Sequence, residues 1–214
     1  MSDFMVVGTP VHGLMHPEVV GSFVALCAQI QYPAQFVLKT DCYIHDGRNK
    51  IVQGALDKGA SHTMFIDADM VFEPDAVDRL LSHKKDIVGG MYVRRQPPHL
   101  PTACKREGNK LENIKEWPKD RLFKVYGLAT GFVLIKTEVF KKIEKPWFFY
   151  GYESVFGTQL GDDYYFCHKA QEAGYNVWVD PQIKLGHQGG YIFTERDYEV
   201  YKDQKVEQEE GLRP

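Results

Sequence analysis

The sequence predicts an α/β fold in which helices flank a mostly parallel sheet. Short apolar runs alternate with segments of helical period over residues 4–89, and this alternation is typical of parallel strands joined by right-handed crossovers. The chain has 214 residues, 43% of them hydrophobic and 26% charged, which suits one soluble domain. Two carboxylates also follow the third apolar run, where such sheets carry their sites.

The strands are predicted from short apolar runs, and the helices from apolar residues at 3.6-residue spacing or from helix start and stop signals. In the first helix, Val20, Phe23, Val24, Cys27 and Ile30 form the predicted stripe. Predicted strands cover 4–8, 36–38, 63–67, 86–89, 131–135 and 176–179, and predicted helices cover 17–30, 48–58, 74–83, 137–144 and 162–173. The pattern breaks at 94–118, where four prolines indicate a long excursion.

The charges are unevenly distributed, although the net charge is only −3. Residues 79–145 contain 16 Lys and Arg against 7 Asp and Glu, and the rest of the chain is acidic. A basic block of this kind suits either a solvated surface or an anionic partner. The chain ends in a polar, acidic segment that we predict to be a surface helix or a partly disordered tail, 195–214.

We expect neither a targeting signal nor a zinc site in this chain. No apolar run approaches the roughly 20 residues of a membrane span, and no basic segment precedes the first strand as in a signal peptide. The four cysteines form no C-x-x-C pair, so they are expected to be reduced thiols rather than zinc ligands. We therefore expect a cytoplasmic protein.

Asp67 and Asp69 are the first candidate site residues. Alternate residues of a strand share a face, so both carboxylates are expected to point into one cleft at the sheet's carboxyl edge. Carboxylates placed in this way suit a divalent cation that bridges phosphates. The alternative is an ordinary strand-to-turn junction, because Asp is a good turn former.

A second acidic pair, Asp162 and Asp163, follows Gly161 and opens a predicted helix. Aspartates at a helix start either cap the helix and complement its dipole or provide a rigidly held general base. His187 follows the last predicted strand in a glycine-rich loop, which would let its ring approach a ligand closely.

Together, the order of elements, the Asp67-Ala68-Asp69 triplet, the Gly161-Asp162-Asp163 helix start and the His187 loop resemble GT-A fold glycosyltransferases, most closely the family 2-like enzymes. The resemblance runs from residue 4 to residue 190 and is strongest over 161–189. It implies a GT-A (nucleotide-diphospho-sugar transferase) fold with a Rossmann-like, mostly parallel sheet. The catalytic domain would cover 1–194, with the 94–118 excursion as an acceptor-side insertion.

The resemblance also implies roles for individual residues. Asp69 and His187 would bind Mn²⁺ or Mg²⁺, with Asp67 holding the ribose or a metal-bound water, and the cation would stabilise the leaving diphosphate. Asp163 would deprotonate the acceptor, with Asp162 positioning it. The implied contacts to the nucleotide sugar, expected to be a UDP-sugar, come from Thr9, Pro10, Asp41, Arg48, Asn49, Asp67 and Ala68.

The sequence departs from the family pattern at two points. Asp162 stands where the family usually has Glu, and His168-Lys169 stand near a position that often holds Arg. Inversion at the anomeric carbon follows only from the family 2 analogy, because retaining GT-A enzymes share the aspartate triplet and the histidine. The acceptor stays open among a glycan, an anionic polymer and a modified nucleic-acid base.

Three other function classes fit the sequence less well. A haloacid-dehalogenase-type phosphatase would carry its first Asp near the N-terminus, followed by Gly-Thr, whereas Met70 follows the triplet here. A sugar-phosphate nucleotidyltransferase would carry a glycine-rich, arginine-containing loop after the first strand, which 8–13 does not supply. A non-catalytic sugar-binding module would not require both acidic pairs and the histidine.

Overall fold

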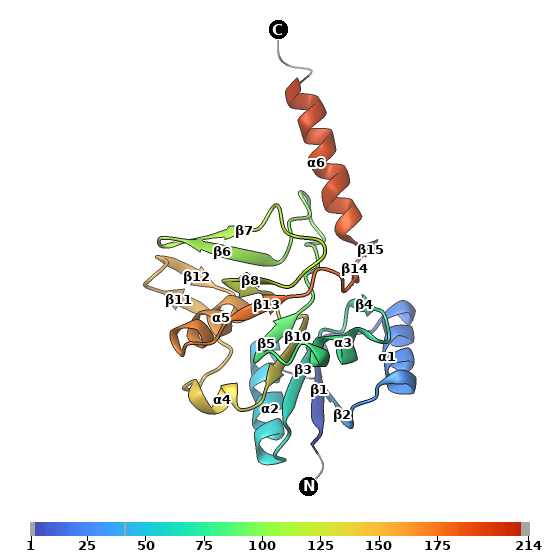
Figure 1. The fold of residues 1–214 in the computed structure, drawn as a ribbon, viewed down its shortest axis with the longest axis vertical. Coiled ribbons are helices and arrows are strands. Elements are labelled where there is room, and N and C mark those ends of the chain that lie inside the picture. Colours follow the sequence, from blue (N-terminus) through green and yellow to red (C-terminus); the bar gives the residue numbers. More distant parts are fainter. Residues whose placement is uncertain (1–2, 41, 211–214) are drawn as a thin grey trace.

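The computed structural model describes residues 3–40 and 42–210, with side chains up to residue 204, and contains a large mixed sheet flanked by helices (Figure 1). Five of its seven strands run parallel, and β10 and β8 run antiparallel to them. In spatial order the strands are β2 (Ala34–Lys39), β1 (Met5–Pro10), β3 (His62–Ile66), β10 (Phe132–Lys136), β5 (Ile87–Gly89), β13 (Val177–Val179) and β8 (Phe123–Val125). The predicted mostly parallel sheet is confirmed at this level, but β10 separates β3 from β5.

Helices cover both faces of the sheet. Because side chains alternate along β3, Phe65 joins the core under α2 (Ile44–Asp57), α4 (Val139–Lys142) and α5 (Asp162–Glu172). Met64 and Ile66 join the core under α1 (Pro17–Gln29) and α3 (Ala76–Ser82). Both faces of the central strands β1, β3, β10 and β5 are therefore buried, which explains the continuous apolar runs in these strands.

Three smaller sheets and a terminal helix complete the described chain. The elements of the small sheets are β15 (Ile192–Phe193), β14 (Leu185–Gln188) and β4 (Met70–Phe72); β7 (Lys110–Asn113), β6 (Ala103–Glu107) and β9 (Gly127–Leu128); and the hairpin β11 (Gly151–Glu153) and β12 (Thr158–Leu160). Part of the predicted 94–118 excursion thus folds as β6 and β7. The polar segment after 194 forms α6 (Glu195–Glu210), which extends away from the body of the molecule (Figure 1).

The predicted buried stripe of α1 is only partly confirmed: Phe23 and Ile30 pack half-buried against the core, but the other three members do not. Val20 and Val24 are exposed and so is Cys27, whereas Val19, Ser22 and Leu26 are buried. The physical reason is the contact of α1 with the short strand β4, which the sequence did not reveal: the Ser22 hydroxyl accepts a hydrogen bond from the Phe72 amide at 3.1 Å. This contact turns a different face of the helix inward.

Helix α2 begins at Ile44, four residues before the predicted start, so Arg48 lies inside the helix. The helix packs very closely on β1, because a Cβ at Gly8 would lie 2.3 Å from Cγ2 of Ile51. This close approach carries Arg48 to the carboxyl edge of the sheet. No helix among residues 3–40 and 42–210 is long and apolar enough to cross a membrane.

Candidate functional site

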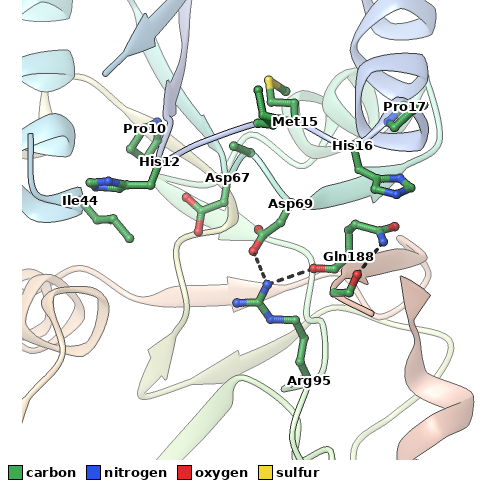
Figure 2. A pocket seen from close by; sticks show the side chains of 13 residues that line it. Pro10, His12, Met15, His16, Pro17, Ile44, Asp67, Asp69, Arg95 and Gln188 are labelled. Carbon is green, nitrogen blue, oxygen red and sulfur yellow. Dashed lines mark hydrogen bonds and ion pairs between the residues drawn. The ribbon is translucent and has the colours of Figure 1, made fainter. Parts of the chain in front are cut away.

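A pocket of about 600 Å³ opens at the carboxyl ends of β1 and β3 (Figure 2). In α/β sheets this edge is where ligands bind. The pocket is lined by Pro10, His12, Leu14, Met15, His16, Pro17, Ile44, Asp67, Ala68, Asp69, Arg95, Gln188 and Gly189. The predicted aspartate triplet therefore forms part of its wall.

The two aspartates of the triplet share one pocket, as predicted, but the reason is different. Strand β3 ends at Ile66, and the triplet forms a tight turn into β4, closed by a 3.2 Å hydrogen bond from the Met70 amide to the Asp67 carbonyl. The turn, rather than alternation along a strand, directs both carboxylates into the pocket (Figure 2).

Arg48 joins the two acidic motifs into one cluster. Its side chain is 3% exposed, and its Nη2 donates to both oxygens of Asp67 at 2.9 and 3.0 Å. Its Nη1 contacts Asp162 Oδ2 at 2.6 Å and Asp163 Oδ1 at 2.9 Å. Three carboxylates from two separate segments are thus held by one buried guanidinium, which we call the Arg48 cluster (Arg48, Asp67, Asp162 and Asp163).

The Arg48 cluster corrects the role that the resemblance implied for Arg48. A guanidinium enclosed by three carboxylates has no free face for a nucleobase. The single cation does not neutralise all three negative charges. Burial raises the pKa of Asp67 above its ordinary value, against the opposing pull of Arg48. Burial raises the pKa of Asp163 in the same way, with a further increase from Asp162.

Asp163 is held in a defined orientation. The Thr130 hydroxyl and Arg48 Nη1 both contact Oδ1, and the backbone of Thr130 also hydrogen-bonds to the carboxylate. The side chain is still 25% exposed. It therefore combines a fixed position, a raised pKa and partial exposure, which are the requirements for a general base.

His187 lies in strand β14 rather than in the predicted loop, which corrects that expectation. Strand β14 pairs with β4 in antiparallel register, with His187 opposite Met70, and this pairing places the ring beside Asp69. The ring Nδ1 lies 2.9 Å from the Val93 carbonyl. Because a carbonyl only accepts hydrogen bonds, Nδ1 carries a proton, and Nε2 is the ring nitrogen that faces Asp69.

Asp69 and His187 suit a divalent cation. Their Oδ2 and Nε2 atoms are 3.3 Å apart, close to the separation of about 3 Å expected for neighbouring ligands that each lie about 2.1 Å from one ion. The bond from Nδ1 to Val93 is the orienting contact typical of metal-binding histidines. Within the described ranges no group of three or more His, Cys, Asp and Glu could hold a metal, so a cation there would need further ligands from substrate or water.

Asp69 also faces the guanidinium of Arg95, which the sequence did not indicate. Nη1 of Arg95 lies 3.2 Å from Asp69 Oδ2 and donates to the Gln188 carbonyl at 3.0 Å (Figure 2). Although burial alone would raise the pKa of Asp69, its hydrogen bond with His187 and the charges of His187 and Arg95 lower it. Asp69 thus stays ionised more readily than Asp67 or Asp163.

The other predicted donor residues are distributed unevenly. Pro10 and Ala68 line the pocket, whereas Thr9 is buried at the end of β1 and Asp41 lies outside the described residues. The expectation for Asn49 is corrected: its amide binds the backbone of 147–148, donating to the Phe148 carbonyl at 2.7 Å and accepting from two amides at 3.1 Å. Asn49 therefore fixes a chain segment, not a nucleotide.

The fold is shared with known structures. No protein-family model matches the chain, and no curated protein does. The crystal structure of A197 from STIV is similar with a TM-score of 0.61 and 18% sequence identity, over 87% of this chain and 86% of that one. At this identity the similarity supports the α/β architecture alone.

Proposed function

We propose that this chain is a metal-dependent glycosyltransferase of the GT-A fold that moves a hexose from a nucleoside-diphosphate sugar, a UDP-sugar, to an acceptor hydroxyl. The observation that carries the proposal is the convergence at one sheet edge of three acidic or histidine motifs far apart in the sequence. Asp67 and Asp69, the Asp162-Asp163 pair and His187 are brought together through Arg48 and the pairing of β14 with β4. Capping or turn formation alone would not require this convergence.

The pocket fits a donor of this class. Its volume of about 600 Å³ falls in the range of small-molecule sites, about 300–1,000 Å³. One part of its wall is made by Pro10 and Ile44, and another by Asp67, Asp69 and Arg95. The nucleoside would lie against the first part, as the family resemblance implies, and the diphosphate would lie against the second.

Asp69 and His187 would hold Mn²⁺ or Mg²⁺, the cation that the family resemblance implies. When bound there, the cation would supply positive charge to the departing diphosphate. Asp67 is fixed by Arg48 at both oxygens and would orient the donor ribose or a water molecule at the site. The chain itself thus contributes one anionic and one neutral ligand.

Asp163 would act as the base. Its carboxylate would take the proton of the acceptor hydroxyl while the hydroxyl oxygen bonds to the anomeric carbon of the sugar. The bond between that carbon and the diphosphate oxygen breaks in the same step, and the nucleoside diphosphate leaves with the bonding electrons. This in-line displacement inverts the anomeric configuration, and Asp162 would position the acceptor.

The acceptor class proposed from the sequence is a glycan, an anionic polymer or a modified nucleic-acid base. The 94–118 segment reaches the pocket through Arg95 and continues into β6 and β7. It therefore stays the proposed acceptor-side insertion.

A nucleotide-sugar hydrolysis screen, with and without Mn²⁺, tests the proposal. We expect one UDP-sugar to be consumed in a Mn²⁺-dependent manner, because water can replace the acceptor. Transfer to the acceptor would then give a product of inverted anomeric configuration. Absence of turnover of every nucleotide sugar in both conditions would contradict the proposal.

A further inference from the structure

Arg95 lines the pocket and, unlike Arg48, is accessible to a ligand there. It follows β5 within the proline-containing segment, and its side chain is 48% exposed. The side chain reaches Asp69 by lying across Gly189, where an added Cβ would be 2.8 Å from Arg95 Cδ. A glycine at 189 therefore keeps the path to Asp69 open.

Few contacts hold Arg95 in place. Its ion pair with Asp69 and its hydrogen bond to the Gln188 carbonyl both use Nη1, and Nε and Nη2 have no partner in the part of the chain that the structure describes. An exposed ion pair of this kind contributes little to stability. The guanidinium can leave Asp69 at small cost, and it carries unused donors into the pocket.

Arg95 and a metal ion compete for the same oxygen. Both would interact with Asp69 Oδ2, the oxygen that also faces His187 Nε2. A divalent cation at this oxygen would repel a guanidinium that stays 3.2 Å from it. The donor brings a diphosphate into the same pocket, and a planar guanidinium matches phosphate oxygens through two parallel hydrogen bonds.

We propose that Arg95 occupies Asp69 while the pocket is empty and moves to the diphosphate when metal and donor bind. This inference rests on the proposed function, since it assigns Arg95 to the diphosphate of the same donor. Arg95 would then be a substrate-binding residue, and its pairing with Asp69 would hold the metal ligand in position before the donor arrives.

Calorimetric titrations with two probes test this exchange. We compare wild type, Arg95→Gln and the matched control Arg94→Gln, which removes the same charge one residue earlier from an exposed side chain. Without Arg95, Mn²⁺ alone should bind several-fold more tightly, because a competing cation is gone. UDP in saturating Mn²⁺ should bind about 10–100-fold more weakly, the effect of losing a charged hydrogen-bond partner. Arg94→Gln should change neither affinity by more than about twofold.

The opposite effects of Arg95→Gln on Mn²⁺ affinity and on UDP affinity separate a substrate-binding role from a structural one. Weaker Mn²⁺ binding by Arg95→Gln would overturn the proposal, because Arg95 would then only position Asp69. Unchanged UDP affinity in that variant would also overturn it, while Mn²⁺-dependent UDP binding by wild type would leave the proposed function standing. Inorganic pyrophosphate serves as a probe without a nucleoside: if Arg95→Gln weakens its binding but wild type binds UDP no better than pyrophosphate, the Arg95 assignment holds and the nucleotide donor fails.

Discussion

The two arginines that face the carboxylates of the site are held in opposite ways. Arg48 is 3% exposed and contacts three aspartates, whereas Arg95 is 48% exposed and contacts one. A buried charge must be paired where it lies, because an unpaired one is costly, but an exposed pair is weak and exchangeable. The buried ion pairs therefore fix the side chains of the Arg48 cluster, whereas the exposed ion pair of Asp69 with Arg95 can be exchanged for a ligand.

The largest effect on activity is expected for Asp163, the proposed base in the rigid Arg48 cluster. Asp163→Asn keeps the shape of the side chain and can still accept the hydrogen bond from the Thr130 hydroxyl, but it cannot act as the base. We expect sugar transfer to fall about 10²–10⁴-fold, the usual contribution of a general base, with unchanged donor affinity and thermal midpoint.

Asp162→Asn is the matched control in the same helix turn. It should reduce transfer less and should act through acceptor affinity. If Asp163→Asn transferred sugar at nearly the normal rate, the carboxylate would be only a structural partner of Arg48, and a retaining mechanism would explain the site better.

Replacement of each arginine compares the contribution of the Arg48 cluster to stability with that of the Arg95–Asp69 pair. Arg48→Met leaves three aspartates without their cation, so we expect the free energy of unfolding to fall by about 3–5 kcal/mol. Arg95→Met removes a weak, exposed contact and should change it by less than about 0.5 kcal/mol. Urea denaturation measures both, and a similar loss in the two variants would show that the contrast in burial has no energetic meaning.

The pH dependence of stability should also have opposite signs for the Arg48 cluster and for Asp69. The folded-state pKa values of Asp67 and Asp163 are raised by burial. Their contribution to stability is therefore lost as pH rises from about 3.9, the unfolded value, through the raised values. The folded-state pKa of Asp69 is lowered: burial opposes this shift, but the hydrogen bond from His187 and the nearby positive charges outweigh it. Its contribution is therefore present above about 3.9 and is lost as pH falls through the lowered value.

Carbon NMR titration of the aspartate carboxyl groups, assigned with the Asp→Asn variants, measures this difference. Asp67 and Asp163 should titrate above about 3.9 and Asp69 below it. If Asp69 titrated at a higher pH than Asp67 and Asp163, the predicted order of the three pKa values would be wrong.

Local signals in the sequence were sufficient for most main elements and for the acidic motifs. Asp67, Asp69, Asp162 and Asp163 stand where apolar strands end or a helix begins, and such junctions can be recognised without the fold. Helix α5 and strand β13 also fall within two residues of their predicted bounds. Each of these predictions depended on residues that are neighbours in the chain.

The parts that could not be predicted depend on contacts between distant segments. Strand β14 becomes visible only through its pairing with β4, and this pairing, not a loop, places His187 beside Asp69. Arg95 lies in a proline-containing segment without periodicity, so no local pattern distinguishes it from Arg94. The enclosure of Arg48 likewise follows from the packing of α2 on β1 and from α5.

A calorimetric Mn²⁺ titration of Asp69→Asn and Asp67→Asn most directly tests the claim that Asp69 binds the metal whereas Asp67 belongs to the Arg48 cluster. Both substitutions remove one carboxylate from the same turn, but only Asp69 faces His187, and Asp67 is occupied by Arg48. We predict that Asp69→Asn lowers Mn²⁺ affinity by at least about 10–100-fold, and that Asp67→Asn lowers it much less. Wild-type Mn²⁺ affinity in Asp69→Asn would contradict the account.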